Sequence, residues 1–215
     1  MKIFYVSAKQ DVNVPVSVME DLAKKVPDET VIVTTLQFSD FAKKFFRFLK
    51  KRKKVFMDRD GIVLGCDLRA AKKFEKKASS FLYIGSGNFH PLVLALEINK
   101  PVFVFNPNTL QFFRLQEKEI KKFEARKRAA YSKVVASEKI GILVSIKKGQ
   151  LRLKEALKLK RELEKKGKKV YIFLFDTFFP EQLENWKEIA WINTACPGIS
   201  LEQNFLEARH ANFDL

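Results

Sequence analysis

The feature that most constrains the fold of this chain is a repeated alternation between short apolar runs and amphipathic segments. The runs are rich in β-branched and aromatic residues and about four to eight residues long, which is typical of buried strands. They stand at 2–8, 30–35, 53–57, 61–66, 81–85, 101–107, 141–146, 169–175 and 190–196. Strands that alternate with helices predict parallel pairing with helices on the faces. We therefore expect an α/β fold of two related domains, each with a mainly parallel sheet flanked by helices.

The segments between the runs carry helical spacing. One helix is expected over 15–26, with Pro15 suited to its first turn, and Ser39 is placed to cap the next. In that second helix an apolar stripe follows the i, i+4, i+7, i+8 pattern: Phe41, Phe45, Phe48 and Leu49. The spacing favours core packing over nucleic-acid stacking, the other function that phenylalanines among lysines allow. Further helices are expected over 67–78, 92–98, 114–137 and 151–166, the last closed by Gly167.

The long helix over 114–137 separates two halves, so we place one α/β domain in residues 1–137 and a second in residues 138–215. Each half runs a strand into a glutamine, then a helix and a strand, and later a strand that ends in a cysteine. This pattern indicates an internal duplication. It relates Gln37 to Gln150, and Cys66 to Cys196.

The charge balance is strongly basic, with 41 Lys and Arg against 25 Asp and Glu and a net charge of +16. Such a surplus attracts nucleic acid, ribosomes or an acidic protein partner. It also fits a lysine-rich protein from a hot-adapted or archaeal organism, so both interpretations stay open. No segment approaches the roughly 18 apolar residues of a membrane span, and the N-terminal run is too short for a signal peptide. We expect a cytoplasmic protein with no membrane partner.

Cys66 and Cys196 are the two cysteines of the chain. A disulfide between them is not expected in the cytoplasm, and neither lies in a zinc-binding spacing. A buried cysteine usually acts as a small hydrophobic residue. Both, however, follow expected strands, at the edge where ligands of open α/β sheets bind. Core packing and a ligand role therefore both stay open.

The loop GSGNFHP lies between an expected strand and an expected helix. Backbone N–H groups at a helix N-terminus can hold an anion, which makes Gly85, Gly87 and His90 candidate binding residues. The loop is neither a P-loop nor a G-x-G-x-x-G motif, and a tight turn that needs two glycines is the simpler alternative. His90 could serve as a ligand, a base or a hydrogen-bonding group of the turn.

Five segments, in this order, carry a resemblance to a known family: VLGCDLRAA, FLYIGSGNFHPLVLAL, PVFVFNP, FEARKRAAYSKVVASEKIGILVSIKKGQ and WINTACPGIS. The series resembles the diphthamide-biosynthesis 3-amino-3-carboxypropyltransferases of archaea and eukaryotes. The resemblance implies a radical enzyme of three related α/β domains, each with one cysteine ligand of a 4Fe–4S cluster that binds S-adenosylmethionine. Such enzymes transfer the 3-amino-3-carboxypropyl group to a histidine of translation elongation factor 2, the first step of diphthamide biosynthesis.

Carried onto this sequence, the resemblance implies that Cys66 and Cys196 are metal ligands from the family's second and third domains. It places Gln150 near the methionine end of the cofactor, and the glycines and histidine of the GSGNFH loop near the site. It identifies no catalytic residue. Two departures stand out: the chain begins where the family's second domain begins, and Gly198 replaces the usual arginine.

From the resemblance we expect a C-terminal part or subunit of a split enzyme, with a separate polypeptide supplying the missing first domain and the third cysteine. The alternative is a non-catalytic paralogue that acts as a binding or scaffold partner in the same pathway. Translation elongation factor 2 is the expected target. The sequence leaves open whether the chain forms homo- or hetero-oligomers and whether its basic surface binds RNA or the ribosome.

Overall fold

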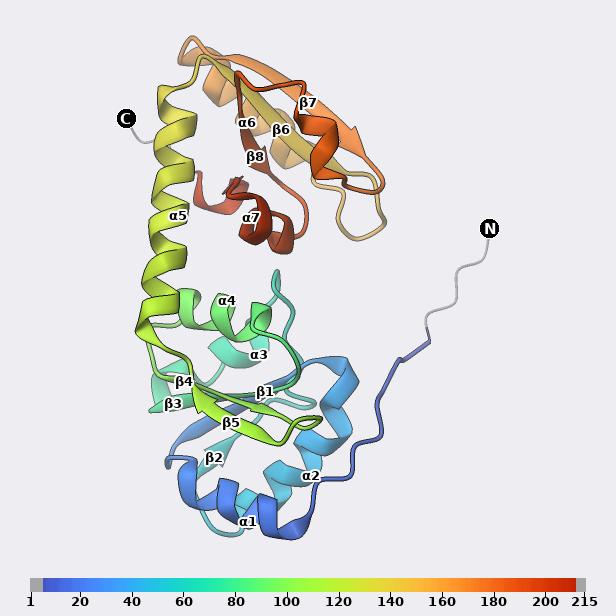
Figure 1. The fold of residues 1–215 in the computed structure, drawn as a ribbon, viewed down its shortest axis with the longest axis vertical. Helices are drawn as coiled ribbons and strands as arrows, with labels where there is room; N and C mark the ends of the chain where they lie inside the picture. Colours follow the sequence, from blue (N-terminus) through green and yellow to red (C-terminus); the bar gives the residue numbers. More distant parts are fainter. Residues whose placement is uncertain (1–5, 212–215) are drawn as a thin grey trace. The chain divides into compact units, whose positions relative to one another are not determined.

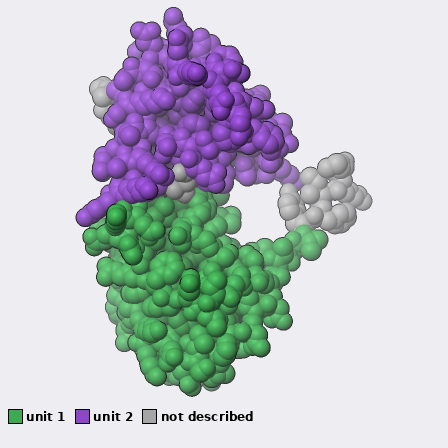
Figure 2. All heavy atoms as spheres, in the orientation of Figure 1, with its two compact units in different colours: residues 1–120 green, residues 121–215 purple. Residues whose placement is uncertain are grey.

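A computed structural model describes residues 6–211, apart from the side chain of Leu201. The chain folds into two compact units, residues 1–120 and 121–215 (Figure 2). Each unit contains one sheet with helices, so the expected α/β fold with two mainly parallel sheets is confirmed. The boundary between the units falls inside the long helix α5 (Glu117–Ala136). Among the described residues no helix combines the length and apolar character that a membrane span requires.

Unit 1 is built on a five-stranded sheet with the order β2-β1-β3-β4-β5 (Figure 1). Its strands are β1 (Thr30–Thr34), β2 (Val55–Phe56), β3 (Ser80–Ile84), β4 (Val102–Asn106) and β5 (Gln111–Arg114). The first four are parallel, and β5 pairs antiparallel with β4. Its helices are α1 (Val16–Lys25), α2 (Ser39–Lys50), α3 (Arg69–Lys72) and α4 (Phe89–Glu97), with short 3₁₀ turns η1 (Leu36–Phe38) and η2 (Glu75–Lys77). Both β1 and β3 are buried along their whole length. Burial on both faces of the sheet explains why their sequences are continuous runs and do not alternate between apolar and polar residues.

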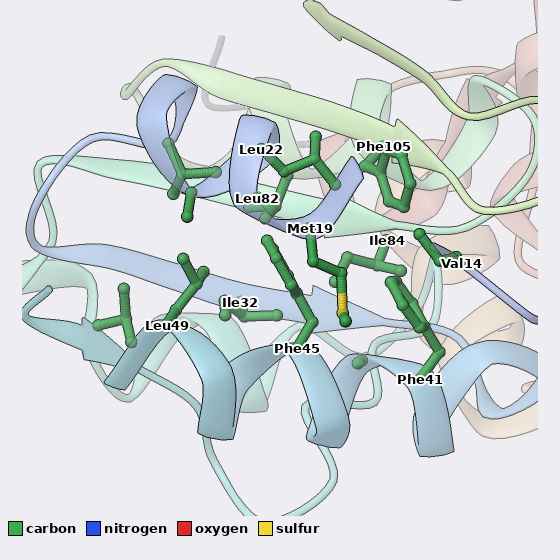
Figure 3. Close-up of a cluster of buried hydrophobic side chains, with 14 of the residues drawn as sticks. Val14, Met19, Leu22, Ile32, Phe41, Phe45, Leu49, Leu82, Ile84 and Phe105 are labelled. Atoms are coloured by element: carbon green, nitrogen blue, oxygen red, sulfur yellow. The ribbon is translucent and has the colours of Figure 1, made fainter. Parts of the chain in front are cut away.

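The core of unit 1 lies between the sheet and the helices α1 and α2 (Figure 3). Phe41, Phe45 and Leu49 point from α2 toward the sheet, as the helical stripe predicted, and Phe48 packs at the margin. They meet side chains of α1, β1, β3 and β4, namely Met19, Leu22, Ile32, Leu82, Ile84 and Phe105. The phenylalanines of α2 are therefore core residues and not a stacking surface for nucleic acid.

Unit 2 is built on a four-stranded parallel sheet with the order β7-β6-β8-β9. Its elements are β6 (Lys139–Ser145), α6 (Leu153–Lys165), β7 (Lys169–Phe175), η3 (Pro180–Leu183), β8 (Ile189–Asn193), α7 (Pro197–Gln203), β9 (Leu206–Glu207) and η4 (Ala208–His210). Ala130 and Val134 of α5 and Leu159 and Leu163 of α6 pack on one face of this sheet. The other face carries an aromatic cluster of Trp191, Phe173, Phe175, Phe178 and Phe205.

The two sheets share a strand order, which supports the predicted duplication. In each unit the first strand lies between the second and the third, and the fourth follows the third. Gln37 and Gln150 both lie between the first strand and the helix that follows it, as expected. Cys66, however, lies between the second and third strands of its unit, whereas Cys196 lies between the third and fourth. The prediction that the two cysteines occupy related places is therefore wrong, because linear spacing does not report strand order.

Several predicted boundaries also differ. The run at 2–8 lies partly outside the described residues, and its described part, 6–8, is not a strand; Val6 is 89% exposed. Ser39 is the first residue of α2 and not its cap, because its hydroxyl donates backward to the Leu36 carbonyl at 2.9 Å. The helix expected over 67–78 is reduced to α3 and η2, since Asp67 belongs to a turn.

Gly167 ends α6 as predicted. Its φ is 79°, a left-handed conformation that glycine adopts without a steric penalty. The N–H of Gly167 donates to the Glu164 carbonyl at 2.9 Å and that of Lys168 to the Leu163 carbonyl at 3.1 Å. These two bonds form a Schellman motif, which satisfies carbonyls that the helix end leaves free.

Candidate functional site

Cys66 stands at the exposed tip of a tight turn in unit 1. Leu64 and Asp67 exchange backbone hydrogen bonds across it, at 2.9 Å and 3.0 Å. The preceding segment pairs with the end of β1, where the Val63 N–H donates to the Thr34 carbonyl at 2.8 Å. The turn therefore lies at the carboxyl edge of the sheet, the edge at which α/β proteins bind ligands. The thiol is free and accessible.

Asp67 closes this turn and lies two residues before the first residue of α3. Its carboxylate accepts from the Arg69 backbone N–H at 3.0 Å and pairs with the Arg69 guanidinium at 2.6 Å. The hydrogen bond from Arg69 is the main reason that the pKa of Asp67 lies below its usual value. The carboxylate beside Cys66 is therefore already engaged by a cation.

Gly65 seats the turn on the ring of Phe89, the first residue of α4. A Cβ on Gly65 would lie 2.5 Å from Cζ of that ring, closer than any real contact. Only glycine lets the turn approach so closely. The contact joins the Cys66 turn to the GSGNFH loop. Phe89 was missed by the sequence analysis, although the glycine immediately before Cys66 was a signal for a close neighbour.

The two glycines of the GSGNFH loop are each required by the local structure, for different reasons. Gly87 has a φ of 73°, which favours glycine. A side chain on Gly85 would collide with the Tyr83 hydroxyl. The loop thus fits the simpler prediction of a tight turn, and no described contact assigns it a ligand.

His90 stands in the first turn of α4 against two other rings. Its ring stacks on Tyr83 with centroids 5.9 Å apart, and Nδ1 lies 3.5 Å from the Tyr83 hydroxyl. Phe89 meets it edge-on at 4.9 Å. Burial lowers the pKa of His90 and raises the pKa of Tyr83 to about 12. At neutral pH the imidazole is therefore uncharged and the phenol keeps its proton.

A chain of side-chain amides lies near the same edge of unit 1. Gln37 Nε2 donates to Gln10 Oε1 at 2.7 Å, and Gln10 Nε2 donates to Asn108 Oδ1 at 2.9 Å. Gln37 follows β1, Asn108 follows β4, and Gln10 lies in the segment before α1. Gln10 and Asn108 carried no sequence signal, because their partners are distant in the chain.

Cys196 lies in unit 2, between β8 and α7, and is half-buried. Buried Asn193 at the end of β8 organises its segment. Asn193 Nδ2 donates to the Cys196 carbonyl and to Ser200 Oγ, both at 2.9 Å, and Oδ1 accepts from the Ala195 N–H at 2.9 Å. Asn193 was missed, although a polar residue at the end of a buried run was a signal.

Gln150 is exposed in the turn after β6. Its N–H donates to the Lys147 carbonyl at 3.0 Å, and Gly149 before it has a φ of 85°. The position lies at the carboxyl edge of the unit 2 sheet. No described contact tests the predicted role of its amide.

The two free cysteines are ligands of the type that binds an iron–sulfur cluster. Cysteine thiolates are the usual ligands of such clusters, and each unit offers one free cysteine on a loop. Among residues 6–211 no group of three or more His, Cys, Asp and Glu side chains could hold a metal ion. The described residues thus supply cluster ligands one at a time, and a complete set needs further donors.

Comparisons with known proteins match these features. Residues 1–206 fit the profile of the diphthamide synthesis protein family. Relatives named 2-(3-amino-3-carboxypropyl)histidine synthase share 32% identity over 187 residues in Pyrococcus horikoshii and 30% over 180 residues in Methanocaldococcus jannaschii. Each match covers 83% of this chain, and 53% and 47% of the relatives. The chain therefore spans about half the length of these relatives.

Solved structures agree with the sequence matches. Dph2 from Pyrococcus horikoshii matches 94% of this chain and 62% of its own length, with a TM-score of 0.82 and 29% identity. The structure titled as that protein with a 4Fe–4S cluster has a TM-score of 0.81. A Caenorhabditis elegans relative, 27% identical over 149 residues, is named subunit 1 of the synthase; the match covers 66% of this chain and 36% of that relative. The chain belongs to the diphthamide synthesis protein family.

Proposed function

We propose that this chain acts in the transfer of the 3-amino-3-carboxypropyl group from S-adenosylmethionine to a histidine of translation elongation factor 2. The observation that carries the proposal is a pair of free, loop-borne cysteines in a member of this family. In this proposal Cys66 and Cys196 bind one 4Fe–4S cluster. The cluster bound to Dph2 of Pyrococcus horikoshii supports the cofactor.

The third cysteine ligand comes from outside this sequence, which has two cysteines. It belongs either to another part of the same polypeptide or to a second polypeptide, as in a split enzyme. The subunit name of the Caenorhabditis elegans relative supports an assembly of more than one chain. The net charge of +16 would steer an acidic or RNA-associated target toward the protein in the cytoplasm.

When bound, the cluster supplies the electron that opens a carbon–sulfur bond of S-adenosylmethionine. The chain's own residues hold the ligands. The contact of Gly65 with Phe89 fixes the Cys66 turn, and Asn193 fixes the backbone of Cys196. The exposed amide of Gln150 is assigned to the carboxylate at the methionine end of the cofactor. Neutral His90, Gly85 and Gly87 belong to the loop whose Phe89 contacts the Cys66 turn, and they are assigned to cofactor binding.

The second candidate function is a non-catalytic scaffold in the same pathway. Gly198 favours it, because this residue of α7 stands two positions after Cys196, where the resemblance implies an arginine. Glycine removes a side chain that could bind an anionic group. The retention of both thiols favours the catalytic function, because a scaffold needs neither.

Anaerobic reconstitution with iron and sulfide tests the proposal. The full chain is loaded alone and together with an α/β polypeptide that carries one candidate cysteine, and the visible absorbance and the EPR spectrum after reduction are recorded. We expect a cluster that is lost in Cys66→Ala and in Cys196→Ala, with thermal unfolding curves showing that both variants fold. A cluster that forms only with the added polypeptide would support a split enzyme.

A cluster that survives both substitutions would contradict the ligand assignment. No cluster under any condition would favour the scaffold.

A further inference from the structure

A concavity of about 420 Å³ in unit 2 is lined by cationic, amide and aromatic residues that the proposed function does not use. It lies between α5 and the segment that joins α7 to β9. Arg126 and Lys133 reach it from α5, Gln203 and Asn204 stand at the end of α7, and Trp191 and Phe205 line its apolar part. The concavity thus offers two cations, two side-chain amides and the half-buried ring of Phe205.

The cations of this concavity have no anionic partner in the described part of the chain. Its lining contains no carboxylate, and no ion pair of residues 6–211 involves Arg126 or Lys133. A second concavity of unit 2, of about 500 Å³, differs in this respect. There Lys139 and Lys187 stand with Glu184 and Glu188, and Lys139 bonds Glu188 at 2.5 Å. The uncompensated charge is therefore a property of the first concavity and not of the whole surface.

The helix positions the two cations together. Residues 126, 129, 130, 133 and 134 of α5 recur at i, i+3, i+4, i+7 and i+8, which is one face of a helix. Ala129 and Ala130 are small, so the long side chains of Arg126 and Lys133 stand on either side of an open stretch. Two turns separate them, roughly 10 Å along the axis, a span that two flexible cationic side chains can close onto one anion.

The donor set selects the chemistry of the ligand. A guanidinium and an ammonium offer only N–H donors. The two side-chain amides add further N–H donors, beside their own carbonyl oxygens. A phosphate group carries more acceptor oxygens and more charge than a carboxylate, and arginine binds it with two parallel hydrogen bonds. The half-buried ring of Phe205 adds an apolar surface that suits a planar base, whereas Trp191 is buried in the aromatic cluster and supports Phe205 from behind. The combination fits a nucleotide.

We infer that this concavity binds a nucleotide through its phosphate, either as a free nucleotide or as one residue of an RNA strand. It is separate from the cysteine of its unit. Cys196 precedes the first turn of α7, whereas Gln203 and Asn204 end that helix. The inference goes beyond the proposed function and does not depend on a cluster.

Calorimetric titration of the full chain at constant ionic strength tests it, with adenosine 5′-monophosphate, inorganic phosphate, adenosine and a short oligoadenylate as probes. We expect saturable 1:1 binding of the monophosphate, about tenfold or more tighter than of phosphate or adenosine. Tighter binding of the oligoadenylate would identify RNA as the source, and equal or weaker binding would identify a free nucleotide. If neither the monophosphate nor the oligoadenylate binds saturably, the inference is overturned.

Matched variants locate the binding. Arg126→Met should weaken binding of the monophosphate roughly tenfold, since it removes a charge-assisted hydrogen bond. Arg128→Met removes the same charge from the same helix but is absent from the lining, and should leave affinity unchanged. Equal losses in both variants would mean general attraction to a basic protein. If Arg126→Met leaves the affinity for the monophosphate unchanged but lowers thermal stability, the guanidinium serves to hold the C-terminal end of α7 and not to bind a ligand. Either result overturns the inference.

Asn204 offers a second variant that is safe for the backbone. Its φ is 56°, so Asn204→Gly removes the amide and relieves the left-handed conformation. We expect weaker binding of the monophosphate without loss of stability. Binding should persist in the Cys66→Ala, Cys196→Ala double variant. Its loss there would place the nucleotide at the cysteines instead and overturn the inference.

Discussion

In unit 1 the cysteine lies on a turn between the second and third strands, whereas in unit 2 it lies between the third and fourth strands, ahead of a helix. The strand order of the two sheets is nevertheless the same. Buried apolar runs set the order, and connecting segments at the carboxyl edge carry the thiols, one exposed and one half-buried. A repeated fold therefore does not imply a repeated arrangement of site residues.

The units also use glycine and aromatic pairs differently. Gly65 lies against Phe89 and holds the Cys66 turn close to α4. Gly141 of β6 lies under Trp191, its register partner on β8, and supports the aromatic face of the sheet. The first pair supports a loop that carries a thiol, and the second supports the core.

The largest effect is expected from core truncations, one in each unit. Phe45→Ala and Leu163→Ala should each lower the free energy of unfolding by about 3–4 kcal/mol, because both side chains are buried and leave cavities. Hydrogen exchange of the full chain should then show lost protection confined to the mutated unit. Loss in both units after either substitution would contradict the division into separate cores.

The glycine pairs should give smaller losses. Gly65→Ala and Gly141→Ala should each cost about 1–3 kcal/mol of stability, since the added methyl overlaps a ring. Only Gly65→Ala should raise the rate at which Cys66 is alkylated, and Phe89→Leu in the same chain should partly restore the stability. Equal alkylation rates in both glycine variants would remove the special role of the Phe89 contact.

Asn193→Ala should cost about 1–3 kcal/mol, because it leaves the Ala195 N–H without its acceptor. Mass spectrometry should show faster alkylation of Cys196 and an unchanged rate for Cys66. Asn193→Asp keeps the acceptor but loses the two donor bonds to Cys196 and Ser200, so its effect should be intermediate. An Asp variant as damaged as the Ala variant would show that the donor bonds dominate.

The smallest effect is expected in the pH dependence of stability, through His90 of unit 1. Burial places the pKa of folded His90 below the unfolded value of 6.5, so the unfolded chain binds more protons. The stability from neutral His90 is therefore fully present above pH 6.5 and is lost as pH falls toward the folded pKa. His90→Gln should remove this part of the acid destabilisation in thermal unfolding curves. An unchanged difference between pH 7.5 and pH 5.5, roughly one unit on either side of an ordinary histidine pKa, would assign the effect elsewhere.

The long buried strands could be predicted from the sequence, because β-branched runs such as that of β1 favour buried strands. The strands β5 and β9 could not, because they are short and lie at sheet edges. Both cysteines could be singled out by residue type and by their places after apolar runs. Phe89 and Asn193 could not, because their roles arise from contacts that only the folded chain brings together.

The cysteines are anchored through their backbones. The Cys66 turn is closed by Leu64 and Asp67, and the Cys196 carbonyl accepts from Asn193, while within residues 6–211 neither sulfur takes part in a hydrogen bond. Exchange or oxidation at either sulfur therefore breaks no bond that the fold uses. The two thiols are therefore chemically separable from the fold, and a change at either sulfur should leave the backbone of both loops in place.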